Sequence, residues 1–169
     1  MMDEIICKIA ETAAEREGHF AARRAAFVEE QGLFEASDVD EHDAYAIHLV
    51  AVNLSGGAVV GAVRCYPAGG DVWYGGRLAV LPAYRRQASS IGANLCRLAE
   101  ATVLAHGCRL FLAYIQMQNV RFFERLGWRA YGDVAIHYGV PHLLMAASLA
   151  RPVQAAERLE IRVRQVAHV

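Results

Sequence analysis

The chain contains no apolar run that approaches the roughly 18 residues needed to cross a membrane. It also has no marked excess of charge, because 17 Lys and Arg stand against 18 Asp and Glu, for a net charge of −1. This balance excludes a nucleic-acid-binding surface, apart from a local basic patch such as Arg85-Arg86. The first residues lack the basic-then-apolar pattern of a secretory signal. We expect a soluble, cytoplasmic protein with neither membrane nor nucleic acid as partner.

Closely spaced cysteines are missing as well. The four cysteines (Cys7, Cys65, Cys96 and Cys108) form no C-x-x-C pair and have no histidine at metal-ligand spacing. A disulfide framework or a zinc site would need such spacing, so we expect four buried thiols that act as small apolar residues. There is no internal repeat. The 169 residues, 55% of them hydrophobic, suit one domain with a sizeable core.

What the chain does contain is organised around the stretch from Trp73 to Arg97. Leu78 to Leu81 has the apolar character of a buried strand, Pro82 stops it, and a helical pattern follows a basic turn. A strand that turns directly into a helix leaves backbone N–H groups unpaired, and the helix dipole adds positive potential there. We expect the loop Gln87 to Gly92 to hold an anion, with Gly92 in the first helical turn. The alternative is an ordinary solvated helix start.

Strand and helix patterns alternate along the rest of the chain. Strands are predicted at residues 5–10, 48–54, 59–66, 109–115, 130–138 and 142–149, and helices at 13–30, 91–106 and 119–126. Thr12 is the expected cap of the first helix, and Gly107 and Gly127 are expected to end the later ones. The strand–helix–strand order around the central stretch implies a right-handed parallel crossover, and we expect its two strands to diverge and leave a cleft.

An acidic loop lies between the first helix and the second strand. Glu35 to Asp43 holds five carboxylates in nine residues. The loop is either a solvated connection or a binding site for cations. A divalent metal is disfavoured, because the spacing does not match a calcium loop and no glycine marks the turn. A polyamine or another amine substrate suits the charge better.

Two motifs resemble those of a known family. Gln87 to Gly92 reads Q-x-x-S-x-G, and Asn119 to Trp128 reads N-V-R-F-F-E-R-L-G-W. Both resemble motifs of the GNAT acetyltransferases, in which loop amides hold the pyrophosphate of acetyl-CoA. Ser90 stands where the family usually has glycine, and two residues are added after Arg85-Arg86. The resemblance implies an α/β GNAT fold: a mixed sheet of about seven strands, about four flanking helices, and a splayed cleft between the two central parallel strands.

Shorter strings resemble a narrower branch of that family. Phe27 to Gln31, His48 to Ala51 and Gly139 to Met145 are similar to the ElaA-like acetyltransferases and to a related group linked by name to nitrogen starvation. The acidic loop also resembles that of acyl-homoserine-lactone synthases. We assign residues 1–150 to a GNAT acyltransferase domain. Residues 151–169 form an extension in which apolar and charged residues alternate, which predicts an extra strand or a partner contact.

The resemblance implies acetyl-CoA as co-substrate and no metal. The pantetheine arm would pair with the central strand, and the pyrophosphate would bind the loop amides. A strand N–H would stabilise the oxyanion, an effect often worth about 3 kcal/mol. The coenzyme-binding residues expected on this basis are Leu78, Ala79, Val80, Arg85, Arg86, Gln87, Ala88, Ser89, Ser90, Ile91, Gly92, Ala93, Asn119, Phe122 and Phe123.

One position departs from the commoner members. They often carry a tyrosine that protonates the leaving thiolate, four residues before the closing glycine, where this chain has Phe123. Phenylalanine cannot donate a proton. Tyr114, Tyr131 or water would then serve, or the acid is dispensable because a CoA thiolate is a tolerable leaving group near neutral pH.

Attack on a thioester needs a neutral amine, and a carboxylate or histidine can take its proton. Glu30 and His142 are the candidate bases. The alternatives without a catalytic role are an ion pair between Glu30 and Arg23, and a structural role for His142 in the last hairpin. The residues expected to contact or orient the substrate are Arg23, Asp40, Asp43 and Tyr114, and the neighbouring His137 and Tyr138 are not excluded.

The sequence therefore predicts an acetyl-CoA-dependent N-acetyltransferase that acts on a primary amine of a small molecule by direct attack in a ternary complex. A homodimer is compatible with the C-terminal segment. One rival is an acyl-homoserine-lactone synthase-like acyltransferase, which would use S-adenosylmethionine and a longer acyl donor. The other is a non-catalytic acyl-CoA-binding sensor, suggested by Phe123 and by Ser90.

Overall fold

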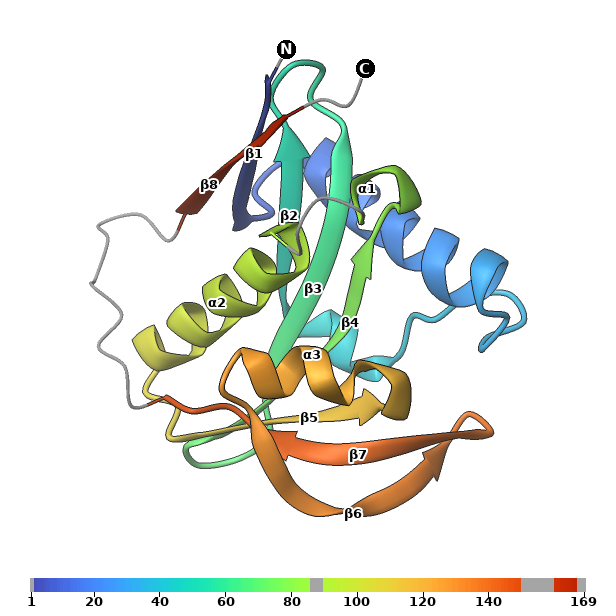
Figure 1. Cartoon of the computed structure of the whole chain (residues 1–169), viewed down its shortest axis with the longest axis vertical. Helices are drawn as coiled ribbons and strands as arrows, with labels where there is room; N and C mark the ends of the chain where they lie inside the picture. The colour runs from blue at the N-terminus through green and yellow to red at the C-terminus, as the bar shows by residue number, and fades with distance from the viewer. Residues whose placement is uncertain (1, 86–89, 150–159, 167–169) are drawn as a thin grey trace.

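One mixed sheet forms the frame of the molecule in the computed structural model, which describes residues 2–85, 90–149 and 160–166 (Figure 1). The strands are β1 (Met2–Ile9), β2 (Ile47–Asn53), β3 (Val59–Pro67), β4 (Val72–Val80), β5 (Leu110–Gln116), β6 (Arg129–His137), β7 (Val140–Ala146) and β8 (Glu160–Val166). They lie in the order β6-β7-β5-β4-β3-β2-β1-β8. The α-helices are α1 (Ala13–Arg24), α2 (Ser90–Ala105) and α3 (Val120–Arg125), and α1 continues into the π-helical segment η1 (Ala25–Glu30). The predicted α/β architecture is confirmed, with eight strands in the described ranges instead of about seven.

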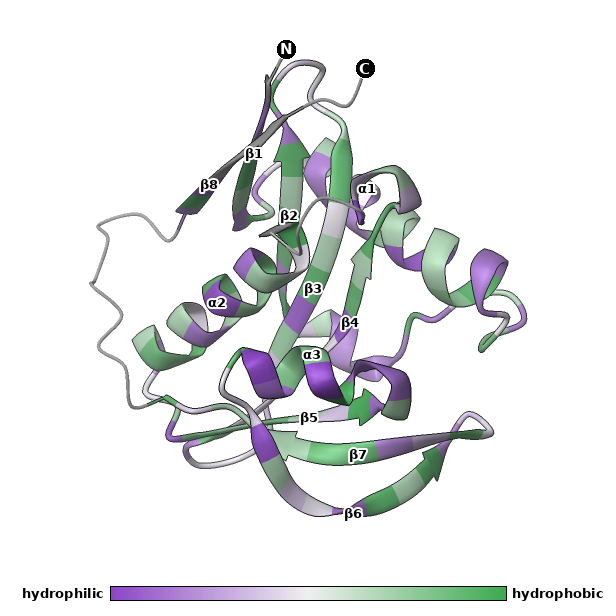
Figure 2. Ribbon diagram, in the orientation of Figure 1, coloured by the Kyte–Doolittle hydropathy of each residue, from purple (hydrophilic) through white to green (hydrophobic). Residues whose placement is uncertain are grey.

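Helices cover both faces of the sheet, with α2 in front and α1 behind in Figure 1. Successive residues of a strand point to opposite faces. Ile5 and Cys7 accordingly join the main core under α2, and Ile6 joins a smaller cluster with Val59 on the α1 side. Figure 2 shows the apolar residues concentrated in the central strands and hydrophilic residues on the outer turns of α1 and α3.

The local signals for the ends of the elements are confirmed. Thr12 caps α1 in a reciprocal capping box with Glu15. Gly107 and Gly127 have φ of +81° and +94° just beyond α2 and α3, a conformation that favours glycine. The last hairpin turns at Tyr138-Gly139, one residue earlier than predicted, because both residues adopt positive φ.

The parallel strands β4 and β5 pair at only three positions, from Val72 with Leu110 to Tyr74 with Leu112. Beyond this point both strands continue without pairing to each other. On its other side β4 has a bulge, since the register with β3 shifts between Ala62 and Arg64. A bulge bends its strand and increases the local twist. The predicted divergence of the two central strands is therefore confirmed, and the bulge accounts for part of it.

The C-terminal residues complete the opposite edge of the sheet. β8 pairs antiparallel with β1, from Met2 with Val166 to Lys8 with Glu160. β8 forms this edge and β6 forms the other, so β7 and β8 lie far apart in the sheet although they follow each other in the chain. Residues 160–166 of the C-terminal segment thus form an added strand beside β1.

The four cysteines are buried and free, as predicted. Burial raises the pKa of the thiols of Cys7 and Cys65 to about 12, so these groups stay protonated and unreactive. Within the described ranges, no helix combines the length and the apolar character that a membrane span requires.

Candidate active site

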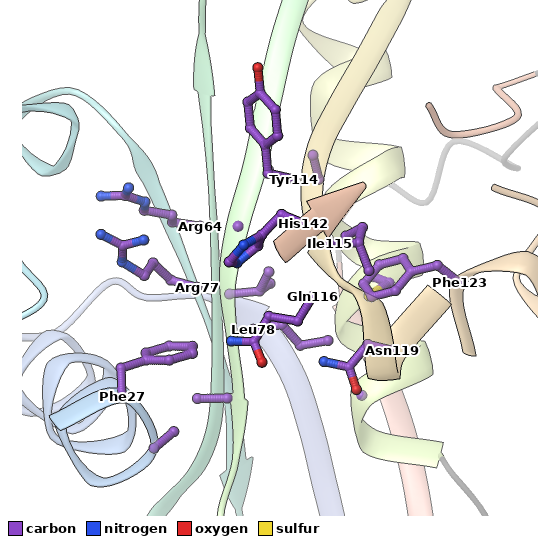
Figure 3. A pocket seen from close by; sticks show the side chains of 18 of the residues that line it. Phe27, Arg64, Arg77, Leu78, Tyr114, Ile115, Gln116, Asn119, Phe123 and His142 are labelled. Carbon is purple, nitrogen blue, oxygen red and sulfur yellow. The ribbon is translucent and has the colours of Figure 1, made fainter. Parts of the chain in front are cut away.

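A cleft with a volume of about 760 Å³ lies where β4 and β5 diverge. Figure 3 shows Leu78 of β4 on one side and Ile115 of β5 on the other. Neighbouring residues of a strand point to opposite faces of the sheet. The lining of the cleft includes Phe111, which belongs to the core under α2. It also includes Tyr66 and Tyr74, whose side chains lie on the opposite face of the sheet. The cleft therefore passes through the sheet and connects its two faces.

The end of the cleft near α2 lies between the part of β4 that is not paired with β5 and the first turn of α2, and we name it the amide end. Its lining residues are Leu78, Ala79, Val80, Arg85, Ile91, Gly92, Asn119 and Phe122. A Cβ atom on Gly92 would lie 3.5 Å from Phe122 and 3.9 Å from Val80, so these three elements converge closely. Because Gly92 belongs to the first turn of α2, unpaired helix N–H groups face this region. The geometry suits an anion approaching the start of α2.

Most of the residues expected to bind a coenzyme line this cleft. Phe123 also lines the cleft. Its side chain is 7% exposed, and its ring packs edge-on against that of Trp128. Ala93 is buried but does not line the cleft. The predictions for Arg86, Gln87, Ala88 and Ser89, and for the side chain of Ser90, lie outside the described residues.

Glu30 forms an ion pair across the mouth of the amide end. Arg85 donates to both of its carboxylate oxygens, at 2.7 and 3.0 Å, and its Nε donates to the carbonyl of Val80 at 2.6 Å. The hydrogen bond from Arg85 lowers the pKa of Glu30 below its ordinary value. The suggested pairing of Glu30 with Arg23 is wrong. Glu30 lines the cleft, but its carboxylate is a weaker base than a free one.

Arg23 pairs instead with the acidic loop. It is fully buried, its Nε lies 2.7 Å from Asp38 and its Nη1 lies 2.7 Å from Asp43. Burial alone would raise the pKa of Asp43, but the hydrogen bond and charge of Arg23 and the charge of Arg64 hold it well below its usual range. Neither Arg23 nor Asp43 lines the cleft. Both therefore support the wall of the cleft from behind.

Two further arginines balance the loop from the sheet. Arg64 of β3 binds both oxygens of Asp40, at 2.6 and 2.8 Å. Arg77 of β4 reaches Asp38 at 3.1 Å and Asp40 at 3.3 Å. Three of the five carboxylates are thus paired with the protein's own arginines, and Asp40 is the one that lines the cleft. The negative charge of these three carboxylates, on which the amine-binding interpretation of the loop partly rested, is balanced within the protein.

Sequence reasoning missed Arg64 and Arg77 as parts of this site. Each interrupts an otherwise apolar or small-residue strand, and a charged residue in such a place needs a buried partner. From this signal one could have predicted that both arginines form ion pairs with the acidic loop. It could not have shown which carboxylate each one meets.

His142 lies on β7, opposite the end of β5, where it pairs in register with Gln116. Its Nδ1 lies 2.8 Å from the carbonyl of Val140, so Nδ1 carries the proton and Nε2 keeps a lone pair. Burial lowers the pKa of His142 and the neighbouring His137 lowers it further, against the raising effect of the Val140 bond. The imidazole is therefore neutral at pH 7. Figure 3 shows its ring directed into the cleft between β4 and β5.

Of the tyrosines considered as thiolate acids, Tyr114 lines the cleft and is 40% exposed. Tyr131 is 52% exposed on β6 and does not line it. Only Tyr114 of the two is placed to reach a group bound inside. Among the described residues no cluster of His, Cys, Asp and Glu could hold a metal ion.

The profile of the Acetyltransferase (GNAT) family matches residues 10–128. A protein of Bacillus subtilis (strain 168), whose name assigns it to the acetyltransferases, is 30% identical over 75% of this chain and 84% of its own. The crystal structure of Escherichia coli ElaA has a TM-score of 0.72 at 21% identity and covers 88% of this chain and 100% of that one. An aminoglycoside 6'-N-acetyltransferase complexed with coenzyme A has a TM-score of 0.69 at 18% identity, covering 86% and 98%.

Proposed function

The chain belongs to the acetyltransferase (GNAT) family, and we propose that it transfers the acetyl group of acetyl-CoA to a primary amine of a small molecule by direct attack in a ternary complex. The observation that carries this proposal is the cleft through the sheet between β4 and β5. Two substrates can enter such a cleft from opposite faces and meet inside it. No covalent enzyme intermediate is then needed.

The amide end suits the coenzyme. The stretch of β4 that is not paired with β5, at Leu78, Ala79 and Val80, offers backbone groups to the pantetheine amides as a neighbouring strand would, apart from the Val80 carbonyl that Arg85 already occupies. The first amides of α2 offer donors to the pyrophosphate, and Gly92 leaves room for it. The same fold in an aminoglycoside acetyltransferase complexed with coenzyme A supports this placement.

In the reaction a bond forms between the amine nitrogen and the carbonyl carbon while the thioester C–S bond breaks. The amine loses one proton, and coenzyme A leaves as thiolate or, after taking up a proton, as thiol. A β4 backbone N–H stabilises the negative charge on the carbonyl oxygen. We assign the base to Nε2 of His142, directly or through a water, with Glu30 as the second candidate. Tyr114 or water protonates the thiolate.

The first test is thermal unfolding with and without acetyl-CoA. At about a hundred times the dissociation constant, binding adds roughly 2.7 kcal/mol, which raises the melting temperature of a chain of this size by about 5–11 °C. Thiol release in the presence of amines then measures turnover. No shift at any concentration would contradict the proposal.

The same assays separate the rivals. A non-catalytic sensor would give the thermal shift with no thiol release for any amine. This outcome is tested because Phe123 stands where related enzymes often carry a proton-donating tyrosine. A lactone synthase would form its product only with S-adenosylmethionine and a longer acyl donor, which mass spectrometry detects. The ElaA-like branch, the cytoplasmic location, the homodimer and the division at residue 150 stay predictions.

A further inference from the structure

A row of aromatic rings crosses the sheet at the end of the cleft opposite α2, and we name it the aromatic end. His42 of the acidic loop stacks on Tyr66 of β3, with ring centres 4.2 Å apart and an interplanar angle of 5°. The row continues from Tyr66 to Tyr74 of β4, at 6.1 Å and 14°, and from Tyr74 to Tyr114 of β5, at 6.1 Å and 18°. His137 follows Tyr114 at 4.2 Å. All five line the cleft. The row thus runs from the acidic loop to the neighbourhood of His142, whose ring lies 5.5 Å from that of His137.

Neighbouring groups of the protein cover part of the ring faces in this end of the cleft. Stacked neighbours occupy the faces along the row, and the guanidinium of Arg64 lies 5.3 Å from the centre of the Tyr66 ring. Arg77 lies 4.8 Å from the ring centre of Phe34 and 5.7 Å from that of Tyr138. At Tyr66, Phe34 and Tyr138 the protein's own arginines thus occupy positions at which an ammonium group of a ligand would be attracted to a ring face.

What the row presents to the cleft is therefore ring edges and hydroxyl groups. Ring edges carry partial positive charge and attract the face of another aromatic ring. Burial raises the pKa of Tyr66 and of Tyr74, so both hydroxyls stay protonated at neutral pH. Such a surface suits an aromatic ring lying across it and offers a second ammonium group only neutral hydroxyl oxygens, with no negative charge.

The carboxylates of the cleft lead to the same conclusion. Among the lining residues that the structure describes there are two, Glu30 and Asp40. Asp40 is bound by Arg64 and Arg77, and Glu30 by Arg85. A polyamine would need an unpaired carboxylate for each further ammonium group. This cleft offers it none.

We propose that the acceptor is an arylalkylamine, a single primary amine joined by a short chain to an aromatic ring, and that polyamines are poor acceptors. The inference rests on the proposed function and names its substrate class. The ring lies across the edges of Tyr74 and Tyr114, and the amine reaches toward His142. Because the row ends beside His142, a short alkyl chain connects the ring to the amine.

The experiment measures thiol release from acetyl-CoA with three amines: 2-phenylethylamine, butylamine and spermidine. Two edge-to-face ring contacts make kcat/KM for 2-phenylethylamine about tenfold or more above that for butylamine. Spermidine falls below butylamine. A spermidine value equal to or above that for 2-phenylethylamine overturns the inference, and so does an equal rate for 2-phenylethylamine and butylamine.

Two variants at one position locate the effect. Tyr114→Leu removes a ring of the row, and the preference for 2-phenylethylamine over butylamine falls about threefold or more. Tyr114→Phe keeps the ring and keeps the preference. The preference is a ratio, so any change in proton transfer to the thiolate cancels from it. An unchanged ratio in Tyr114→Leu overturns the assignment of the ring site.

The thermal shift with acetyl-CoA separates failure of this inference from failure of the proposed function. A shift together with thiol release for spermidine alone leaves the transferase standing and refutes the arylalkylamine. A shift with no release for any of the three amines refutes the arylalkylamine as well. The absence of both shift and release refutes the proposed function and the inference that rests on it.

Discussion

At the amide end of the cleft, the groups available to a ligand are mostly backbone: the open edge of β4 and the first turn of α2. At the aromatic end they are side chains from separate elements, held by three arginines and three aspartates. A backbone site tolerates changes of side chain as long as the space stays open. A side-chain site depends on the identity of each partner. The predictions below test this contrast, beginning with the largest expected effect.

Arg23→Met should destabilise the protein by about 3–5 kcal/mol, because it leaves Asp38 and Asp43 buried without their shared cation. Urea unfolding measures the change. The matched control is Arg16→Met on the exposed side of the same helix, which should change stability by less than about 0.5 kcal/mol. Equal effects of the two substitutions would show that the ion cluster does not support the aromatic end.

His142→Asn should lower kcat about 100-fold while the KM for acetyl-CoA stays unchanged, since the residue lies on β7, away from the amide end. The unmodified protein should lose activity on acidification with a midpoint below about 6.5, because the pKa of His142 is lowered and its neutral form is the base. Steady-state rates across pH give both results. Full activity of His142→Asn beside an inactive Glu30→Gln would transfer the role of base to Glu30.

Gly92→Ala should raise the KM for acetyl-CoA about tenfold, because a methyl group enters the space left for the coenzyme. The new Cβ makes only ordinary contacts of 3.5 and 3.9 Å, so the free energy of unfolding should not fall. Gly56→Ala, at an open turn, is the control for both quantities. A coenzyme KM unaffected by Gly92→Ala would argue against a pyrophosphate site at the start of α2.

Acidification from pH 7.5 to 5.5 should remove about 1.4 kcal/mol of stability through His19. Its imidazole is fully buried, and burial lowers its pKa to about 3. Below about pH 6.5 the unfolded chain takes up a proton that the folded protein does not bind, so stability falls as pH falls. Urea unfolding at the two pH values tests this. His19→Gln should flatten the dependence, whereas the exposed His106→Gln should not.

The smallest effect is expected for the stability of Glu30→Gln. Its ion pair with Arg85 is about two-fifths exposed on both sides, and exposed pairs contribute less than about 1 kcal/mol. Unfolding in urea checks the value. A loss of several kcal/mol would mean that the amide end, like the aromatic end, depends on its ion pair.

The same contrast explains what the sequence could predict. The amide end is local in the chain: Gly92 is recognisable from a short motif, and the apolar run of β5 from its composition. The ion pairs of the aromatic end are not local. Asp40 and Arg64 are separated by 24 positions, Asp38 and Arg77 by 39. Pattern and propensity give the faces of each element, but a partner across such a distance depends on strand register and loop course.

Glu30 illustrates this limit. The α-helical spacing of seven residues places Glu30 on the same helix face as Arg23, which predicted an ion pair between them. The partner of Glu30 is instead Arg85, 55 positions away. The switch from α-helix to the π-helical segment at Ala25 changes the angle between successive side chains, so α-helical spacing no longer applies there. The tyrosine row was missed for a related reason. Tyr66, Tyr74 and Tyr114 meet only because three strands adopt this register.

The pairing of β8 with β1 also has a consequence for the order of folding. Arg162 of β8 reaches Glu4 of β1 at 3.2 Å across 158 positions of sequence. β1 can form its other ladder, with β2, as soon as the first third of the chain is made. Contacts of long sequence separation carry the largest loop-closure entropy and form late. During synthesis one edge of β1 thus remains open until β8 has been made, and a nascent chain exposes that edge to chaperones or to other strands.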